Sequence, residues 1–442
     1  MSNVLDVLDQ RAFDLGRAIG VTSVLQSVWV YDRPIDVDGL RRFHHHLQRG
    51  RLSRGIERSP LPFGRHRWVA SEGSSDIEFV ELARPREEFD DWLDEQVNTP
   101  LDCERGPGWH LAVLPFTDGG SGVSLVVLHC LTDGVGLCEA MADAALGRDD
   151  PTRWPAAASR GRFRALREDA GQTLRDIPAV GRAVVAAIRL ARRSRAGAAA
   201  AAQPTITPPA LPGADQPTAV PMATVFVDAD EWDARAQALG GTSNSLLVGL
   251  AARLAQRGGR VGPDGSVVVG MPVNERADGD TRANAIGNAA VTVDPERATT
   301  DLREIRAAVK QALVHYGEEP DEAYAVNAII PLLPKRLLGA TSRVGAPNGV
   351  GSSNLGVVNP AAGRPDGTDA DYLAIKVLPH LGLTEAMLNR FGGTQSFLSG
   401  RANGQVFISA HSYLLDRPNT NDRLRQDLLS ALNDFSLTGM HL

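Results

Sequence analysis

Cysteine and lysine are scarce in this chain of 442 residues, and long apolar runs are absent. None of the three cysteines forms a C-x-x-C pair, which argues against a disulfide framework or a cysteine-based zinc site. The only lysines are Lys310, Lys335 and Lys376, and none precedes serine or threonine, so a Walker-type phosphate loop is absent. No apolar run approaches the roughly 20 residues that a membrane span requires. The first residues lack the features of a signal peptide, so we expect a cytoplasmic protein.

The overall charge excludes a further class of partner. The chain carries 53 acidic and 46 basic residues, which gives a net charge of −7. Nucleic-acid binding usually requires a basic face, so we expect no nucleic-acid partner. Apolar residues make up 43% and charged residues 22%, as in an ordinary globular protein with a sizeable core.

A composition break divides the chain into two parts. Residues 192–221 are rich in Ala, Pro and Gly and have no sustained period, which is typical of a linker. We therefore expect an N-terminal lobe over residues 1–195, a linker over 196–220 and a C-terminal lobe over 221–442. Strand and helix patterns alternate in both lobes, which predicts an α/β architecture.

Hydrophobic periodicity and turn signals predict the individual elements. We expect strands over Ser23–Tyr31, Leu111–Pro115, Val123–Leu128, Ala223–Asp228, Ser266–Val273 and Tyr372–Leu378, and a hairpin of Gln395–Gly400 and Gln405–Tyr413. The hairpin turn is Asn403-Gly404, the strongest short hairpin signal. We expect helices over Asp36–Gln48, Val135–Leu146, Gly161–Arg195, Trp232–Leu239, Thr242–Gln256, Asp301–Tyr316, Glu322–Leu338 and Asn421–Phe435.

The segment from Leu128 to Gly134 has the clearest chemical potential. His129 ends an apolar strand, at the kind of sheet edge where ligands commonly bind. A neutral imidazole there can take a proton from a hydroxyl or amine that attacks a carbonyl. Asp133 is placed to orient the imidazole or pair with an arginine, and Gly134 permits a tight turn with positive φ and close backbone approach. A buried structural histidine beside an Asp-Gly turn explains the same spacing.

Other histidines and Cys130 are weaker candidates. The adjacent residues His44, His45 and His46 lie on a predicted helix and point in different directions, so they cannot share one metal, and we expect no metal site. Cys130 neighbours His129, but successive strand residues face opposite sides, which argues against a nucleophilic role. His411 and His380 lie on or beside predicted strands, where each either lines a site or packs.

The segment Arg182 to Arg195 has an apolar side and many arginines. Two interpretations remain open for it. It is either an interfacial helix that contacts anionic lipid, or a helix packed on its own domain with its arginines in water. The first would place the protein peripherally on the inner face of the membrane.

The 128–134 segment resembles the H-H-x-x-x-D-G motif of the chloramphenicol-acetyltransferase and condensation-domain superfamily. His129 matches the second histidine of that motif, Asp133 its aspartate and Gly134 its glycine, whereas Leu128 replaces the first histidine. That superfamily includes nonribosomal-peptide condensation domains, polyketide-associated acyltransferases and bacterial wax-ester synthase/diacylglycerol acyltransferases.

Five further segments, in the expected order, are similar to motifs of the superfamily, several of them from its wax-ester-synthase branch. They are Pro100-Leu101-Asp102 with Pro107-Gly108-Trp109, Thr242 to Leu247, Met271 to Arg276 with Gly287-Asn288, Ser353-Asn354-Leu355-Gly356, and Ser412-Tyr413. Together with the histidine motif they span about residues 5 to 435, so the resemblance covers nearly the whole chain.

The resemblance implies a pseudo-dimer of two chloramphenicol-acetyltransferase-like α/β lobes with a tunnel between them. His129 would be the general base, with Asp133 structural and Arg276 as its expected partner. Backbone amides near Gly134, or the segment Ser353 and Asn354, would stabilise an oxyanion. His411 and Ser412 are expected to bind substrate.

The expected activity is transfer of an acyl group from an acyl-thioester to a hydroxyl or amine. The donor would be acyl-CoA or a phosphopantetheinyl thioester on an acyl-carrier protein, the acceptor a small molecule or lipid, and no cofactor would be tightly bound. A stand-alone condensation enzyme that forms an ester or amide from carrier-protein substrates is an alternative. A non-catalytic relic of the fold, marked by the loss of the first histidine at Leu128, is another.

Overall fold

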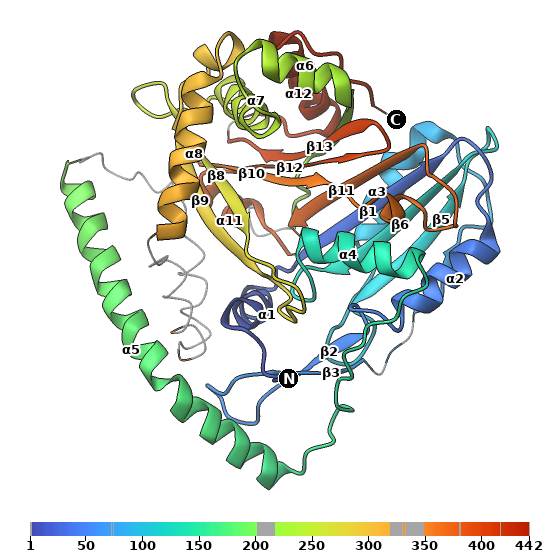
Figure 1. Cartoon of the computed structure of the whole chain (residues 1–442), viewed down its shortest axis with the longest axis vertical. Coiled ribbons are helices and arrows are strands. Elements are labelled where there is room, and N and C mark those ends of the chain that lie inside the picture. Colours follow the sequence, from blue (N-terminus) through green and yellow to red (C-terminus); the bar gives the residue numbers. More distant parts are fainter. Residues whose placement is uncertain are drawn as a thin grey trace.

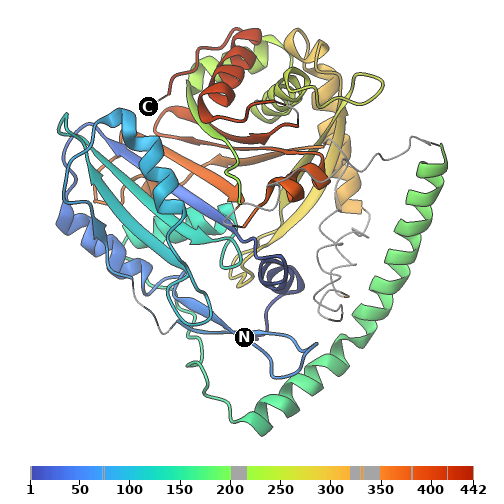
Figure 2. The same cartoon turned by 180° about the vertical axis from the view of Figure 1, so that it is seen from behind.

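The computed structural model describes residues 2–71, 73, 75–200, 217–318, 329, 332, 349–379, 382–415 and 417–441. Within these ranges the chain forms two α/β lobes, each built around one large sheet (Figures 1 and 2). The expected mixed α/β architecture is confirmed. The helix predicted over Glu322–Leu338 lies almost entirely outside the described residues. His380 also lies outside them.

The N-terminal lobe is organised by a five-stranded sheet. Its strands, in spatial order, are β11 (Tyr372–Pro379), β1 (Ser23–Tyr31), β6 (Ser121–Leu128), β5 (Trp109–Pro115) and β4 (Glu78–Phe79). Every residue of β6 is buried, as expected for a central strand with both faces covered. Because β6 lies between β1 and β5, the residue that follows it emerges in the middle of the sheet edge.

Helices and a small hairpin complete this lobe. The helices are α1 (Val7–Ile19), α2 (Val37–Leu47), α3 (Phe89–Val97) and α4 (Gly134–Ala145), and the hairpin is β2 (Arg54–Glu57) with β3 (Arg67–Ala70). Asp36 caps α2 by accepting from the amides of Asp38 and Gly39, as the acidic start of the helix predicts.

The C-terminal lobe contains a six-stranded sheet. Its strands, in spatial order, are β7 (Met222–Asp228), β13 (Gln405–Tyr413), β12 (Thr394–Ala402), β10 (Val350–Val357), β8 (Val267–Asn274) and β9 (Ile286–Val293). Its helices are α6 (Ala229–Ala238), α7 (Ser243–Arg257), α8 (Arg303–Glu318), α11 (Glu385–Phe391) and α12 (Asn421–Asp434). Asn403 and Gly404 have φ of 50° and 73°, the left-handed geometry that a two-residue hairpin turn requires.

Strand β11 joins the two lobes. It pairs with β1 over eight residues, from Ser23 opposite Pro379 to Val30 opposite Tyr372. The sequence division placed this segment in the C-terminal lobe, whereas its strand belongs to the N-terminal sheet. Local patterning predicts the strand correctly but carries no information on which sheet it joins.

The long helix α5 (Arg162–Ala200) follows the N-terminal lobe and runs along the periphery in both views (Figures 1 and 2). It continues past Arg195 to Ala200, so the start of the range expected to be linker is helical. Within the described part of the chain, no helix has both the length and the apolar character needed to cross a membrane.

Candidate active site

His129 follows the last residue of β6 at the centre of the N-terminal sheet. Its backbone amide donates to the carbonyl of Ser23 on β1 at 3.0 Å, and its carbonyl accepts from Nδ2 of Asn284 at 3.1 Å. The residue is partly buried, and its imidazole forms no hydrogen bond with the described residues. The backbone is thus held from both lobes, while neither ring nitrogen is engaged by the part of the chain that the structure describes.

The loop after His129 is held by groups from distant parts of the chain. The guanidinium of Arg54 on β2 donates to the carbonyls of Leu131, at 2.7 Å, and Thr281, at 2.6 Å. Arg54 also lies over the ring of Trp68, 4.1 Å from its centroid, a favourable cation–π geometry. These contacts restrict the path of the chain between His129 and α4.

Asp133 connects the histidine loop to the C-terminal lobe. One of its carboxylate oxygens accepts from the amide of Gly136 at 2.7 Å, which makes Asp133 the N-cap of α4. The other accepts from Arg276 at 2.7 Å and from the amide of Ala285 at 2.9 Å. The Asp133 and Arg276 side chains are 2% and 3% exposed, so this ion pair is fully desolvated. The partner expected for Asp133 from motif order is therefore the partner that the structure provides.

Gly134 does not have the positive φ that we expected. It is the first residue of α4, with helical geometry, so the reason for glycine lies elsewhere. A Cβ at this position would lie 2.8 Å from Cδ2 of Leu355, at the end of β10. The second expected reason, close approach of another segment, explains the glycine. The absence of a Cβ at Gly134 makes room for the Leu355 side chain from the other lobe.

Sequence reasoning missed Asp9 and Asn284, which support His129 from behind. The Asp9 carboxylate on α1 accepts from the amides of Ala283, at 2.9 Å, and Asn284, at 2.8 Å, and from Nδ2 of Asn284. Burial raises the pKa of Asp9 to about 6, against the opposing effects of these amides and of Arg54. A single buried acid in an amphipathic helix belongs to no motif. Its partner Asn284 lies 275 residues away in the sequence, so only the fold reveals the contact.

Ser353 and Asn354 lie on β10, directly before Leu355, so they belong to the same approach to the N-terminus of α4. Asn354 is exposed, and its Oδ1 accepts from the amide of Gly356 at 2.8 Å. Its Nδ2 donates to Oδ1 of Asn244 at 3.4 Å. The segment lies near the start of α4, but the Asn354 side chain is hydrogen-bonded within its own lobe.

His411 bridges the two sheets. Its Nδ1 lies 3.2 Å from the carbonyl of Val377 on β11, so that nitrogen carries the donated proton. Burial lowers the pKa of His411 to about 4, with the carbonyl of Val377 acting in the opposite direction. His411 is therefore neutral at physiological pH and bound internally. Its predicted role in substrate binding remains a prediction.

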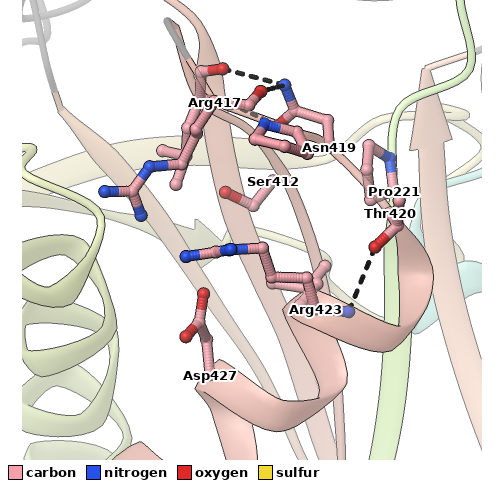
Figure 3. Close-up of a pocket in the computed structure, with 10 residues that line it drawn as sticks. Pro221, Ser412, Arg417, Asn419, Thr420, Arg423 and Asp427 are labelled. Atoms are coloured by element: carbon pink, nitrogen blue, oxygen red, sulfur yellow. Dashed lines mark hydrogen bonds between the residues drawn. The ribbon is translucent and has the colours of Figure 1, made fainter.

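Ser412 faces a different place, a small hollow beside the N-terminus of α12 (Figure 3). The cavity measures about 20 Å³, close to the space of one water molecule. Arg423 and Asp427 lie near the Ser412 hydroxyl in Figure 3, and His129 does not line this hollow. The structure thus places His411 and Ser412 on β13, and within the described residues neither side chain shares a hydrogen bond or ion pair with His129, Asp133, Gly134 or Arg276.

The remaining candidates have structural partners. Cys130 is buried with its Sγ 3.7 Å from that of Cys103, and this contact together with burial raises the pKa of the Cys130 thiol well above its usual value. His44 contacts the carbonyl of Ser75, whereas His46 contacts Asp149 at 3.0 Å. In the described ranges no group of three or more His, Cys, Asp or Glu side chains is arranged to hold a metal ion.

Comparison with known proteins supports the two-lobed architecture. No protein-family model matches the chain, and no curated protein sequence matches it. Solved structures do match along nearly the whole chain. The first condensation domain of the CDA synthetase is 15% identical, with a TM-score of 0.56, and the match covers 100% of this chain and 99% of that one.

Two further structures give the same result. Wax ester synthase/diacylglycerol acyltransferase from Marinobacter aquaeolei VT8 is 15% identical, with a TM-score of 0.55, and the match covers 98% of both chains. Polyketide synthase associated protein 5 from Mycobacterium tuberculosis is 17% identical, with a TM-score of 0.53, and the match covers 95% of this chain and 96% of that one. The two-lobed α/β fold that the resemblance implied is thereby confirmed.

Proposed function

We propose that this protein is an acyltransferase that moves an acyl group from an acyl-thioester to a hydroxyl or amine acceptor. One observation carries the proposal. The imidazole of His129 stands at the centre of a sheet edge, with its backbone hydrogen-bonded on both sides and its ring unpartnered among the described residues. A fixed but unoccupied imidazole is what a general base requires.

His129 removes the proton from the acceptor hydroxyl or amine as the acceptor attacks the thioester carbonyl. A new C–O or C–N bond forms, and an oxyanion develops on the carbonyl oxygen. Collapse of this intermediate breaks the C–S bond, and the imidazolium returns its proton to the leaving thiolate. No acyl-enzyme is needed, so the buried Cys130 thiol with its raised pKa has no part in the reaction.

The N-terminus of α4 is the best candidate for stabilising the oxyanion. Asp133 takes up the Gly136 amide, but the first amides of a helix, here those of Gly134 and Val135, have no partner within the helix. Preorganised amide donors of this kind contribute about 3–4 kcal/mol to lowering such barriers. This favours the helix over Asn354, whose side chain is bound within its own lobe.

Asp133 and Arg276 act as positioning residues. They do not touch the expected reacting atoms, but their buried ion pair ties the start of α4 to the loop between β8 and β9. That loop also supplies Asn284, which binds the carbonyl of His129. The two lobes thus fix the base and the helix amides relative to each other.

The replacement of the first motif histidine by Leu128 does not argue for a relic. Leu128 is 5% exposed and packs in the hydrophobic core of the N-terminal lobe. The leucine at this position is part of the core and leaves the contacts of Asp133, Arg276 and Asn284 around the histidine loop in place. The retention of His129, Asp133, Gly134 and Arg276 in one cluster favours a catalytic protein.

The acyl donor separates the two enzymatic alternatives. Acyl-CoA and a carrier-protein-bound phosphopantetheinyl thioester share the reacting bond, and the similar folds include a wax ester synthase and condensation domains. We favour the general acyltransferase because the His129 cluster requires only a thioester and a nucleophile. A tightly bound cofactor has no role in this mechanism.

The proposal is tested by following thiol release from a panel of acyl-CoA and acyl-carrier-protein donors with alcohol and amine acceptors. We expect release that depends on an acceptor and on His129. Turnover with carrier-protein donors alone would identify a condensation enzyme. Full acyl transfer by a folded His129→Ala variant would contradict the role of His129 as base.

A further inference from the structure

Helix α5 has a surface that the proposed function does not use. It is 39 residues long, about 58 Å at 1.5 Å per residue, and it lies at the periphery of the molecule (Figures 1 and 2). Of its three faces, one is attached to the N-terminal lobe, one is apolar and exposed, and one is lined by arginines.

The attached face is fixed by two acidic residues, Asp169 and Asp176, seven positions apart. Asp169 is fully buried and accepts hydrogen bonds from the side chains of Ser59 at 2.7 Å, Arg160 at 2.9 Å and Arg67 at 3.1 Å. Asp176 pairs with Arg65 at 3.3 Å. These contacts set the rotation of the helix about its axis.

The exposed face carries a row of large apolar side chains, which we call the apolar stripe. Its members recur at three, four, seven and eight positions, so they lie on one side of a helix. They are Phe163, Leu166, Leu174, Ile177, Val184, Val185 and Ile188. Phe163 is 90% exposed, Leu174 67% and Ile177 57%. At about 100° per residue, Leu174 and Ile177 lie roughly 80° to 160° around the helix from Asp169 and Asp176, so the attachment turns the stripe outward.

A row of arginines borders the apolar stripe. Arg164, Arg175, Arg182 and Arg189 are spaced by eleven and seven positions, which places them on one line along the helix. Residues 162–200 contain nine arginines and three acidic residues, although the whole chain has a net charge of −7. Basic charge is therefore concentrated beside the largest exposed apolar row of this helix.

We propose that α5 is an interfacial helix that binds the surface of a membrane containing anionic lipid. The apolar stripe enters the boundary between headgroups and acyl chains, and the bordering arginines contact anionic headgroups. Soluble monomeric proteins rarely expose apolar rows of this extent without a partner. A second copy of the chain fits less well, because pairing two stripes would bring like-charged arginine rows together.

The membrane contact is independent of the proposed acyl transfer, because neither the stripe nor the arginine row includes a residue of the His129 cluster. The test is flotation of the full-length chain with phosphatidylcholine vesicles that contain or lack phosphatidylglycerol. We expect binding to the anionic vesicles, weakening with added salt. The variant with Leu174→Glu and Ile177→Glu should lose at least about tenfold in partitioning, since two inserted apolar side chains become charged.

Leu82→Glu is the matched control, because Leu82 is 79% exposed and lies outside α5. It should float like the wild type. Arg175→Gln combined with Arg182→Gln should reduce binding to anionic vesicles only. Absence of wild-type binding, or unchanged binding of the Leu174 and Ile177 variant, would overturn the proposal. So would light scattering that shows a wild-type dimer and a monomeric stripe variant, since the stripe would then join two copies.

Discussion

Two histidines at comparable places in the two sheets have opposite environments. His129 follows β6 in the N-terminal sheet, and its ring has no hydrogen-bonding partner among the described residues. His411 lies near the end of β13 in the C-terminal sheet, where its ring donates to Val377 and burial lowers its pKa to about 4. The surroundings of each ring, and not its place at a strand end, decide whether it is available for chemistry.

The supporting contacts explain this difference. At His129 the hydrogen bonds from the second lobe reach the backbone, through Asn284, and the neighbouring loop, through Asp133 and Arg276. At His411 the hydrogen bond to the other sheet is made by the ring itself. Both sets of contacts join the two lobes. At His129 they do so without the imidazole, whereas at His411 the imidazole itself makes the contact.

The largest expected effect tests this comparison directly. His129→Ala should lower acyl transfer by about 10² to 10⁴-fold, the usual contribution of a general base. His411→Asn keeps a donor near Val377 and should leave the rate within a few-fold of the wild type. Steady-state thiol release by both variants measures the two effects. Equal losses in both folded variants would mean that the two histidines act together, and the comparison would fail.

The next effect concerns the ion pair that joins the lobes beside His129. Asp133→Ala leaves Arg276 buried with an uncompensated charge and removes the cap of α4. We expect a loss of about 3–5 kcal/mol in the free energy of unfolding, measured by urea denaturation. Asp422→Ala is a suitable control, because the Asp422 side chain is 82% exposed in its pair with Arg425 and should contribute less than about 1 kcal/mol. A small loss for Asp133→Ala would show that the histidine loop is held mainly by Arg54 and Asn284.

Local patterns predicted most of the elements, and motif order predicted the pairing of Asp133 with Arg276. The helix cap at Thr242, the hairpin turn at Asn403 and the partner of Asp133 follow from rules or motifs that span few residues. The support from Asp9 does not, because its partners lie more than 270 positions away. The pairing of β11 with β1 could not be predicted for the same reason, because strand propensity is local whereas sheet membership depends on the whole fold.

The pH dependence of stability sharpens the comparison at His411. Its folded pKa of about 4 lies below the ordinary value of 6.5, so the unfolded state binds the proton more readily. The resulting stability is present above about pH 6.5 and is lost progressively as the pH falls from there to about 4. Between about pH 7.5 and about pH 5, the free energy of unfolding should fall by about 2 kcal/mol more in the wild type than in His411→Asn. Urea denaturation at each pH measures this difference. Parallel pH profiles of the two proteins would show that the His411 ring protonates as easily when folded as when unfolded.

The smallest effect concerns the contact between β10 and the start of α4. A Cβ on Gly134 would press on the flexible end of Leu355, at 2.8 Å from Cδ2, so Gly134→Ala should cost about 1 kcal/mol of stability. Leu355→Ala should remove that contact, and the double variant should be more stable than the sum of the two single losses predicts, by about 1 kcal/mol. A double-mutant cycle by urea denaturation measures this coupling. Additive losses would mean that Leu355 moves away freely, and that the approach of β10 to α4 does not constrain the start of α4.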